Sequence, residues 1–319
     1  MALGLAALAG ARQAPTIRVP VRLVSLPTLV FSKENQLVSG LQKTDFRVFD
    51  NGRLQTVTLD TSSTPVSVAL AVQVNLDIRQ YLPGIAKTGS IVDALVAGES
   101  GETAVITYSG EITVAKSFDT GNVQSTLRSI SPSGTQARMI DAGFHAISLL
   151  TKRPASRSRV LVFIGQPVDS GSESNIAALS ELAAKENVTV FALTLPVFGK
   201  AFVSDTFSLQ GASAAERGGF KAGVDLGKLI AVLNRSNDAE KGADPYSVLV
   251  SATGGTQFHF RKQRQLEDAM ANLGLELRSA YRLNYYPNSS ESGYHTIKIE
   301  VAVSGAKVYA RPGYWLNEN

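Results

Sequence analysis

The sequence predicts an α/β protein built on a doubly wound, mostly parallel sheet. Three apolar runs rich in β-branched residues predict buried parallel strands, at 65–77, 159–164 and 188–195. Segments with helical periodicity separate these runs, and right-handed crossovers then place the strands side by side. The run at 65–77 organises the chain, because ligands of such sheets bind at the carboxyl ends of the strands.

The segments between these strands predict helices and one hairpin. The strands 103–108 and 112–118 are joined by a Ser-Gly turn, which is typical of a hairpin, and 256–260 predicts a last strand of this region. The helical stretch at 78–97 contains Pro83, and a proline in a helix interior costs about 3 kcal/mol. We therefore expect this helix to break there or to begin near Pro83. Helices are also expected at 122–130, 139–150, 175–186, 226–234, 245–250 and 264–278.

Both ends of the chain are predicted to be strands. We expect them at 17–31, 46–49, 54–59, 281–286, 294–303 and 307–310. Pro20 and Pro27 cannot donate to a strand ladder, so the first is expected to be an edge or interrupted strand. Three strands at each end are too few for two separate modules, so they are expected to pair into one β-sandwich. The Gly- and Ser-rich segment 198–225 is interpreted as an insertion or loop.

Composition excludes several classes of protein. With 319 residues, 44% of them hydrophobic and 18% charged, the chain is typical of globular proteins. Its net charge of +4 comes without a basic run interleaved with aromatics, so nucleic acid is not expected as a partner. The sequence has no cysteine, which excludes disulfides, thiolate metal sites and cysteine nucleophiles.

The first fifteen residues are small and apolar. They are too short to span a bilayer, which needs about 20 apolar residues. They are typical of the apolar part of a secretory signal, with Ala9-Gly10-Ala11 as the cleavage site. We therefore expect an exported protein, periplasmic or extracellular, without an integral membrane segment.

Four stretches resemble one known family. The strand 68–72 with its following polar loop resembles the first strand of a von Willebrand factor A domain. The stretches 40–53, 285–287 and 311–315 resemble segments that flank this domain in the VWFA-related proteins common in Acidobacteria. The resemblance covers 17–316. It implies an A-like sheet (65–279) inserted in a β-sandwich made by 16–64 and 280–319, after a signal remnant at 1–15. It also implies a role in adhesion or protein interaction.

The resemblance does not extend to the family's metal-ion-dependent adhesion site. The family places Asp-x-Ser-x-Ser after the first strand, a threonine in a second loop and an aspartate in a third. Magnesium prefers such oxygen ligands, with carboxylates supplying the charge. The matching positions here are occupied by Gln73, Asn75, Asp77, Thr135 and Gln166, and Asp169 matches a segment just outside the metal shell.

Two amides thus replace the two anionic anchors, so we expect a degenerate site without a metal or other cofactor. Gln73, Asn75 and Gln166 are then expected to hydrogen-bond to one another and to loop backbone. The same polar face is also a candidate ligand-binding surface that needs no metal. The alternative is an atypical site in which Asp77, Thr135 and Asp169 hold Mg²⁺ or Mn²⁺.

Signals for catalysis are weak. His145, His259 and His295 have no metal-binding spacing, and the chain has neither a Gly-x-Ser-x-Gly elbow nor a phosphate loop. A group of aromatic residues near the end of the chain predicts core packing rather than a sugar- or peptide-binding platform. The group comprises Tyr285, Tyr286, Tyr314 and Trp315.

The sequence therefore predicts a protein that is not an enzyme. We expect a metal-independent interaction or adhesion module with a protein partner. Two alternatives stay open: a cation-dependent adhesion domain, and an assembly scaffold that uses the edge strands of the sandwich. An unrecognised hydrolase ranks last.

Overall fold

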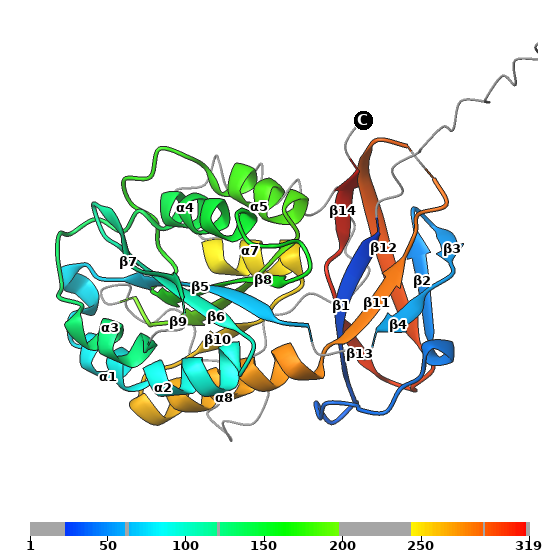
Figure 1. Cartoon of the computed structure of the whole chain (residues 1–319), viewed down its shortest axis with the longest axis horizontal. Helices are drawn as coiled ribbons and strands as arrows, with labels where there is room; N and C mark the ends of the chain where they lie inside the picture. The colour runs from blue at the N-terminus through cyan, green and yellow to red at the C-terminus, as the bar shows by residue number, and fades with distance from the viewer. Residues whose placement is uncertain (1–22, 61–63, 120–121, 198–243, 290, 317–319) are drawn as a thin grey trace, which may run out of the picture.

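The computed structural model describes residues 23–60, 64–119, 122–197, 244–289 and 291–316. It has two parts that lie side by side (Figure 1). One is a sheet with helices on both faces, and the other consists of two smaller sheets without helical layers. The beginning of the predicted first strand, the segment 198–225, the helix at 226–234 and the signal-like start lie outside the described residues.

The first part is a mixed α/β domain around a six-stranded sheet in the order β10-β9-β8-β5-β6-β7. Neighbouring strands pair in parallel except β6 and β7, which form the predicted antiparallel hairpin. This confirms the mostly parallel sheet expected from the apolar runs. The strands are β5 (Val66–Gln73), β6 (Glu102–Tyr108), β7 (Ile112–Asp119), β8 (Ser158–Gly165), β9 (Val188–Thr194) and β10 (Gln257–His259).

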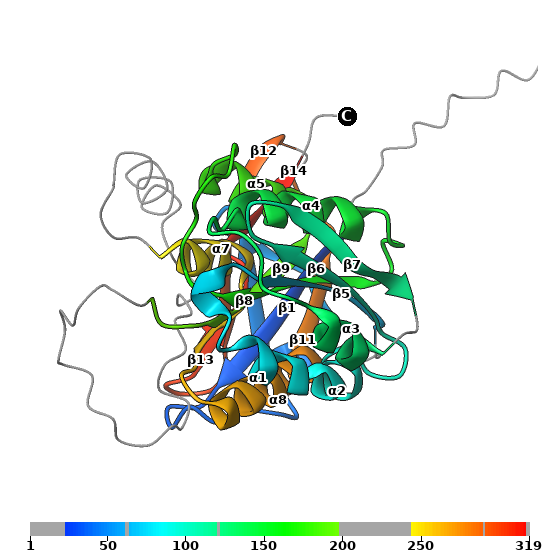
Figure 2. The same cartoon turned by 90° about the vertical axis from the view of Figure 1, so that its left-hand side faces the viewer.

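Helices cover both faces of this sheet (Figure 2). Along β5, Val68, Leu70 and Val72 enter one hydrophobic cluster and Ala69 and Ala71 the other, as the twofold period of a strand requires. One face carries α4 (Met139–Thr151), α5 (Ile176–Lys185) and α7 (Pro245–Thr253). The other carries α1 (Leu82–Lys87), α2 (Gly89–Ile91), η3 (Val92–Ala97), α3 (Val123–Ser129) and α8 (Gln263–Ser279). In the described residues, every helix is too short or too polar to cross a bilayer.

The stretch expected as one broken helix at 78–97 is a chain of short pieces. A 3₁₀ turn, η2 (Leu76–Ile78), precedes α1, and Pro83 lies in the first turn of α1, where its missing N–H costs nothing. The next piece, α2, begins at Gly89. Only glycine fits there, because a Cβ would overlap the backbone of Gln124 in α3. The last piece, η3, is a π-helix. The expectation of a helix beginning near Pro83 is thus confirmed, and its continuity to residue 97 is corrected.

The second part holds two four-stranded sheets built from both ends of the chain, in the orders β13-β1-β11-β4 and β14-β12-β2-β3. Side chains from both sheets form one hydrophobic cluster, which includes Leu26, Val48, Leu283 and Ile299. The short 3₁₀ turn η1 (Lys43–Asp45) leads into β2. The strands are β1 (Val24–Phe31), β2 (Phe46–Asp50), β3 (Arg53–Gln55), β4 (Thr58–Asp60), β11 (Tyr281–Tyr285), β12 (Gly293–Val301), β13 (Lys307–Tyr309) and β14 (Gly313–Leu316).

Three expectations about these strands need correction. The stretch 54–59 is two strands in different sheets, because the chain crosses between them at Thr56 and Val57. Strand β14 was not expected. Strand β1 lies inside its sheet rather than at its edge, but it pairs with β13 only over Leu29–Phe31. Pro27 falls in the half that pairs with β11 alone, so its missing N–H faces the unpaired side of the ladder.

Polar contacts join the two parts. The Arg311 guanidinium donates to the Asn187 side chain (2.6 Å) and to the Ser25 carbonyl (2.7 Å). Arg282 donates to the Ser158 hydroxyl (2.9 Å), at the start of β8. The Lys185 ammonium in α5 lies 5.3 Å from the ring centre of Trp315 in β14. These contacts fix the small sheets against the amino-end side of the α/β domain, away from the carboxyl ends of its strands.

A partly buried ion-pair network at that amino end makes stability depend on pH. Burial raises the pKa of Glu102, but hydrogen bonds from Arg153 and Ser67 and the Arg157 charge outweigh it, so the pKa is lowered. We expect Glu102→Gln to reduce the free energy of unfolding by about 1.5–3 kcal/mol at pH 7, the usual worth of hydrogen bonds to a charged group.

A carboxylate whose pKa is lowered by folding stabilises the folded state fully when the pH is above its unfolded pKa, about 4.3 for glutamate. This stabilisation disappears as the pH falls through the lower pKa of the folded state. Urea denaturation of both proteins between pH 7 and pH 3 measures this. The difference should shrink on acidification. A difference that is constant over this range would contradict an ionic role for Glu102.

Candidate functional site

Three amide side chains form a buried network at the carboxyl ends of β5 and β8. Gln73 ends β5, Asn75 follows it, and Gln166 follows β8; these three residues are called the amide cluster here, and each is at most 3% exposed. The Gln73 Nε2 group donates to Asn75 Oδ1 (2.8 Å) and Gln166 Oε1 (3.4 Å). The mutual hydrogen bonding expected from the sequence is therefore present.

The backbone fixes the direction of every hydrogen bond in the amide cluster. The Gln166 N–H donates to Gln73 Oε1 (2.7 Å), so the other end of the Gln73 amide must be its NH₂ group. Asn75 then accepts at Oδ1 and donates through Nδ2 to Asp77 Oδ2 (3.1 Å) and the Thr135 carbonyl (3.2 Å). Gln166 Nε2 donates to the Pro196 carbonyl (3.0 Å). Because each NH₂ group meets acceptors, reversing any one amide would break a contact.

The loops around the amide cluster are held together by backbone hydrogen bonds. Val74 N–H donates to the Tyr108 carbonyl (2.9 Å), and Leu76 N–H to the Gly134 carbonyl (3.0 Å). Ser133 N–H donates back to the Val74 carbonyl (2.8 Å). Gly134 has a φ of 69°, a conformation that glycine adopts without strain. The loop after β5 and the loop before α4 therefore form one surface.

The solvent side of this surface is defined by Leu76, Asp77 and Thr135, called the rim here. All three are exposed, and Leu76 shows 45% of its surface to solvent although it is a large apolar residue. Asp77 bonds to Asn75 through one oxygen. The rim thus combines an apolar side chain, a carboxylate and a hydroxyl above a rigid polar base, a combination suited to contact with another molecule.

Two tyrosines lie beneath the amide cluster. Their hydroxyls are 2.8 Å apart, from Tyr108 at the end of β6 and Tyr246 in α7, and burial raises the pKa of both phenols. Gly165 leaves room for them, since a Cβ there would lie 2.6 Å from Gln73 Oε1 and 2.7 Å from the Tyr108 hydroxyl. The base of the site is therefore packed and uncharged.

These donors do not fit a hard dication. A magnesium ion needs oxygen atoms with free lone pairs, but Asn75 and Gln73 direct N–H groups into the network. Within the described residues, no group of three or more His, Cys, Asp or Glu side chains is placed to hold a metal ion. Thr135 contacts Asn75 through its backbone carbonyl rather than its hydroxyl.

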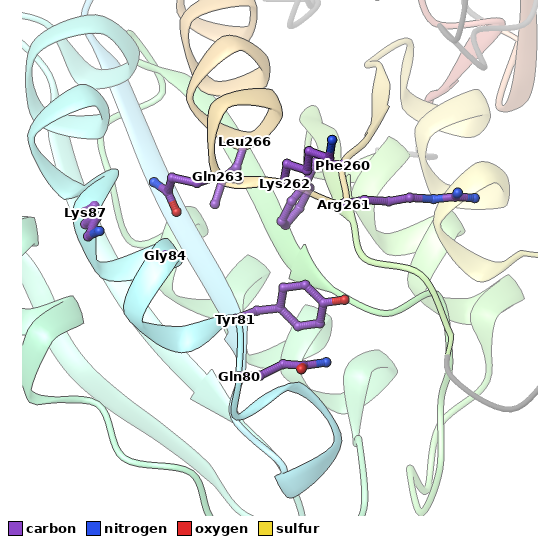
Figure 3. Close-up of a pocket in the computed structure, with 9 residues that line it drawn as sticks. All are labelled: Gln80, Tyr81, Gly84, Lys87, Phe260, Arg261, Lys262, Gln263 and Leu266. Atoms are coloured by element: carbon purple, nitrogen blue, oxygen red, sulfur yellow. The ribbon is translucent and has the colours of Figure 1, made fainter. Parts of the chain in front are cut away.

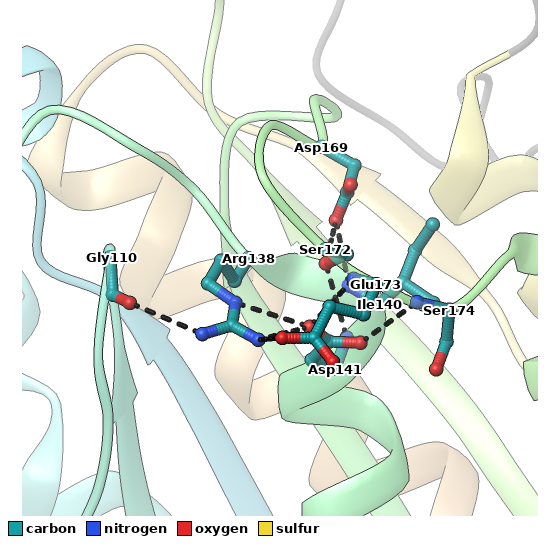
Figure 4. Close-up of polar contacts among 8 residues, drawn as sticks. All are labelled: Gly110, Arg138, Ile140, Asp141, Asp169, Ser172, Glu173 and Ser174. Atoms are coloured by element: carbon teal, nitrogen blue, oxygen red, sulfur yellow. Dashed lines mark hydrogen bonds and ion pairs between the residues drawn. The ribbon is translucent and has the colours of Figure 1, made fainter.

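Asp169 takes part in a different network, at the start of α4 (Figure 4). Its carboxylate accepts from the Ile140 N–H (2.8 Å) and the Ser172 hydroxyl (2.7 Å). It therefore satisfies a backbone donor at a helix N-terminus, where a negative charge is favourable. The structure brings Gln73, Asn75, Asp77, Gln166 and the Thr135 carbonyl into one set of contacts and places the bonds of Asp169 elsewhere.

Asp141, one residue beyond Ile140, is the centre of the same neighbouring network. It accepts from the backbone N–H groups of Glu173 (3.0 Å) and Ser174 (3.2 Å) and from Arg138 (2.7 Å). Burial raises the pKa of Asp141, but these hydrogen bonds and the Arg138 charge outweigh it, so the pKa is lowered. The network fixes the loop 166–175 against α4, next to the amide cluster.

None of the histidines and aromatic residues singled out in the sequence takes part in the hydrogen bonds of the amide cluster. His145 on α4 and His259 on β10 are exposed, whereas His295 is buried in the small sheets beside Asp50. Tyr285 and Tyr314 are buried there too, and Trp315 packs edge-on against Tyr294 at 5.5 Å. Tyr286 is 57% exposed.

Three features near this surface were not predicted from the sequence. Leu76 follows an apolar run, so the sequence pattern predicts that it is buried, whereas it is exposed. The Tyr108–Tyr246 pair joins residues 138 positions apart, which no local pattern can predict. Asp141 could have been found, because an acidic residue in the first turn of a helix, three positions after an arginine, is a known capping and ion-pair signal.

No family model and no curated protein matches the chain. Among solved structures, it is similar to the conserved hypothetical protein BatB from Bacteroides thetaiotaomicron, at 13% identity over 66% of this chain and 98% of that one, with a TM-score of 0.43. It is also similar to a von Willebrand factor type A protein from Catenulispora acidiphila, at 8% identity over 95% of this chain and 76% of that one, with a TM-score of 0.48. At these identities the likeness concerns the fold alone.

Proposed function

We propose that this protein, whose α/β domain has the von Willebrand factor A fold, is a non-catalytic module that binds another protein through the rim and the amide cluster. The observation that carries this proposal is the pairing of a rigid, fully hydrogen-bonded base with an exposed Leu76, Asp77 and Thr135. Such a base pre-organises the rim, which reduces the entropy lost on binding. Among the described residues, the buried hydroxyls of Ser109 and Thr194 at the carboxyl ends of the strands hydrogen-bond with Ser133 and Gln257 rather than with a histidine or carboxylate.

We propose further that this binding needs no metal ion. The directions of the amide hydrogen bonds support this, because Gln73 and Gln166, which replace the anionic anchors, both donate through their NH₂ groups. A cation among them would have to turn at least one amide and break its contact to backbone, at a cost of about 1–3 kcal/mol for each group left unsatisfied.

Two finer points belong to the same proposal. The paired end strands and their common hydrophobic cluster support a β-sandwich, formed by 16–64 and 280–319, into which the α/β domain at 65–279 is inserted. The small, apolar start of the sequence supports export to the periplasm or the outside of the cell.

The proposal is tested by capture on immobilised full-length protein from an extract of the cells that produce it. Wild type, Asp77→Ala, Thr135→Ala and the control Lys152→Ala are compared, each with magnesium and with a chelator. Lys152 is exposed at the end of α4 nearest the amino ends of the strands, so the control removes a charge without touching the rim. A partner retained by wild type and by the control, lost in both rim variants and unaffected by the chelator would support the proposal.

Other outcomes contradict it in different ways. Loss of the partner in chelator restores the cation-dependent alternative, as would micromolar binding of Mg²⁺ or Mn²⁺ in an isothermal titration of chelator-treated protein. If both rim variants still retain the partner, the edge strands of the small sheets become the expected binding surface.

A further inference from the structure

A cavity of about 460 Å³ lies between α1 and the start of α8 (Figure 3). It is separate from the amide cluster and is lined by residues that follow η2, by α1 and by the segment joining β10 to α8. Its volume falls within the range of ligand pockets in proteins, about 300–1,000 Å³. Nothing in the proposed function uses it.

The floor of the cavity is apolar. Phe260, directly after β10, and Leu266, in the first turns of α8, are 3% and 1% exposed. The half-buried ring of Tyr81 lies opposite them (Figure 3). Gln263 closes the wall toward α1, since its Oε1 would overlap a Cβ at Gly84. An apolar side chain would therefore find apolar surroundings here, at the gain usual for burying apolar surface.

Three cations surround this floor. Lys87 belongs to α1, and Arg261 and Lys262 precede α8 on the other side of the cavity. All three are exposed, and none forms a salt bridge with another described residue. The backbone of Arg261 and Lys262 is fixed, because the N–H groups of both residues donate to Gln265 Oε1, at 2.9 and 3.1 Å.

The positive charge of Arg261 acts on Tyr81, which lines the cavity. Burial raises the pKa of Tyr81, and the Arg261 charge offsets part of this rise. The nearby carboxylate of Glu267 accepts a hydrogen bond from Gln263 (2.7 Å) and, among the described residues, forms no salt bridge with the three cations. The cavity therefore combines an apolar floor with a positive border that no carboxylate pairs with in the described part of the chain.

We propose that this cavity binds an acidic peptide segment of a partner protein. An apolar side chain of the segment sits on Phe260 and Leu266, and carboxylates on either side of it pair with Lys87 and with Arg261 or Lys262. A bare phosphate would use the cations but not the apolar floor, and a nucleic acid would need a basic track longer than one cavity. The proposal goes beyond the rim and does not depend on it.

The test uses fluorescence polarisation of a fluorescein-labelled peptide, Glu-Glu-Leu-Glu-Glu, with full-length protein up to about 1 mM. Matched peptides are Gln-Gln-Leu-Gln-Gln, without the charges, and Glu-Glu-Ala-Glu-Glu, without the large apolar side chain. We expect saturable binding of the first peptide, weakened by salt, and at least about tenfold weaker binding of each control, because both the charges and the floor contribute.

Two charge reversals distinguish the cavity from general attraction to a basic protein. Lys87→Glu combined with Arg261→Glu should weaken binding about tenfold or more, since like charges then face the peptide. Lys152→Glu, which changes charge far from the cavity, should leave it unchanged. All these side chains are exposed, and equal melting temperatures confirm that the variants fold.

The proposal is overturned by the absence of saturable binding, by equal binding of the alanine peptide, or by equal losses in the Lys152 control. Thr135→Ala should bind the peptide like wild type. Failure of this experiment therefore leaves the proposed role of the rim untouched, and failure of the capture experiment leaves this one untouched.

Discussion

Asp50→Ala is expected to reduce the free energy of unfolding by about 3–5 kcal/mol, the usual cost of removing one partner from a buried, hydrogen-bonded charge pair. Asp50 is 4% exposed and lies between the two small sheets. Its Oδ2 accepts from the hydroxyls of Tyr285 (2.9 Å) and Tyr314 (2.7 Å), and its Oδ1 lies 2.7 Å from His295 Nδ1. Burial raises the pKa of both tyrosines, so both remain donors.

Asp50→Asn separates the charge of this residue from its hydrogen bonds. His295 Nε2 lies 2.7 Å from the Glu291 carbonyl, which can only accept, so Nε2 carries a proton. A neutral His295 could then accept at Nδ1 from the NH₂ group of the introduced amide, while the amide oxygen accepts from both tyrosines. We therefore expect the asparagine variant to lose about 1–2 kcal/mol, less than the alanine variant.

Urea denaturation of the full chain measures both variants, with Asp268→Ala as the control. Asp268 is exposed, and its replacement should change the free energy by about 0.5 kcal/mol or less. A loss under about 1 kcal/mol for Asp50→Ala would contradict the importance of this buried group. Equal losses for alanine and asparagine would show that the charge, and not the hydrogen bonds, determines the effect.

Gln73→Glu is expected to destabilise the protein by about 3–5 kcal/mol at pH 7, because it creates a fully buried charge without a cation. One carboxylate oxygen would keep the Gln166 N–H. The other would face Asn75 Oδ1 and Gln166 Oε1, which are both acceptors. Turning the Asn75 amide does not help, since its oxygen would then face Asp77 and the Thr135 carbonyl.

The pH dependence of this variant is opposite in sign to that of Glu102. A buried, unpaired carboxyl has a folded-state pKa above its unfolded value, so its destabilising effect is absent below the unfolded value of about 4.3 and develops as the pH rises. Melting curves of wild type and variant from pH 4 to pH 8 should therefore diverge with rising pH. Gln136→Glu, an exposed change on the same loop surface as Thr135, is the control and should melt like wild type. If the difference in melting temperature between Gln73→Glu and wild type did not change with pH, the amide cluster would have to tolerate a buried charge.

Much of the α/β domain could be predicted because its signals are local. The apolar run of β5 and the hairpin turn before β7 read directly as buried strand and turn, and Pro83 marks the start of α1. The mutual bonding of the three amides was also predictable, once the positions of Gln73, Asn75 and Gln166 at neighbouring strand ends were recognised.

The failures concern long-range arrangement. Residues 54–59 have the pattern of one strand, and only the pairing of β4 with the distant β11, while β3 stays with β2, divides them between two sheets. The Asp50–His295 contact spans 245 residues, and the cavity between α1 and α8 depends on how two helices pack, so no local periodicity indicates either. Within the site, the direction of the amide bonds depends on backbone N–H and carbonyl positions that the sequence does not specify.

The pairing of the two ends of the chain has a consequence for biosynthesis. Val24 pairs with Tyr285 and Val48 with Ile299, so β1 and β2 are translated long before their partners. Until the ribosome has released β11 and β12, these early strands expose unpaired edges and apolar side chains, and closing such long loops is slow. The α/β domain between them contains its own sheet and can form first. The vulnerable stage in the synthesis of this protein is then the period in which the N-terminal strands are unpaired, and not the formation of the central sheet.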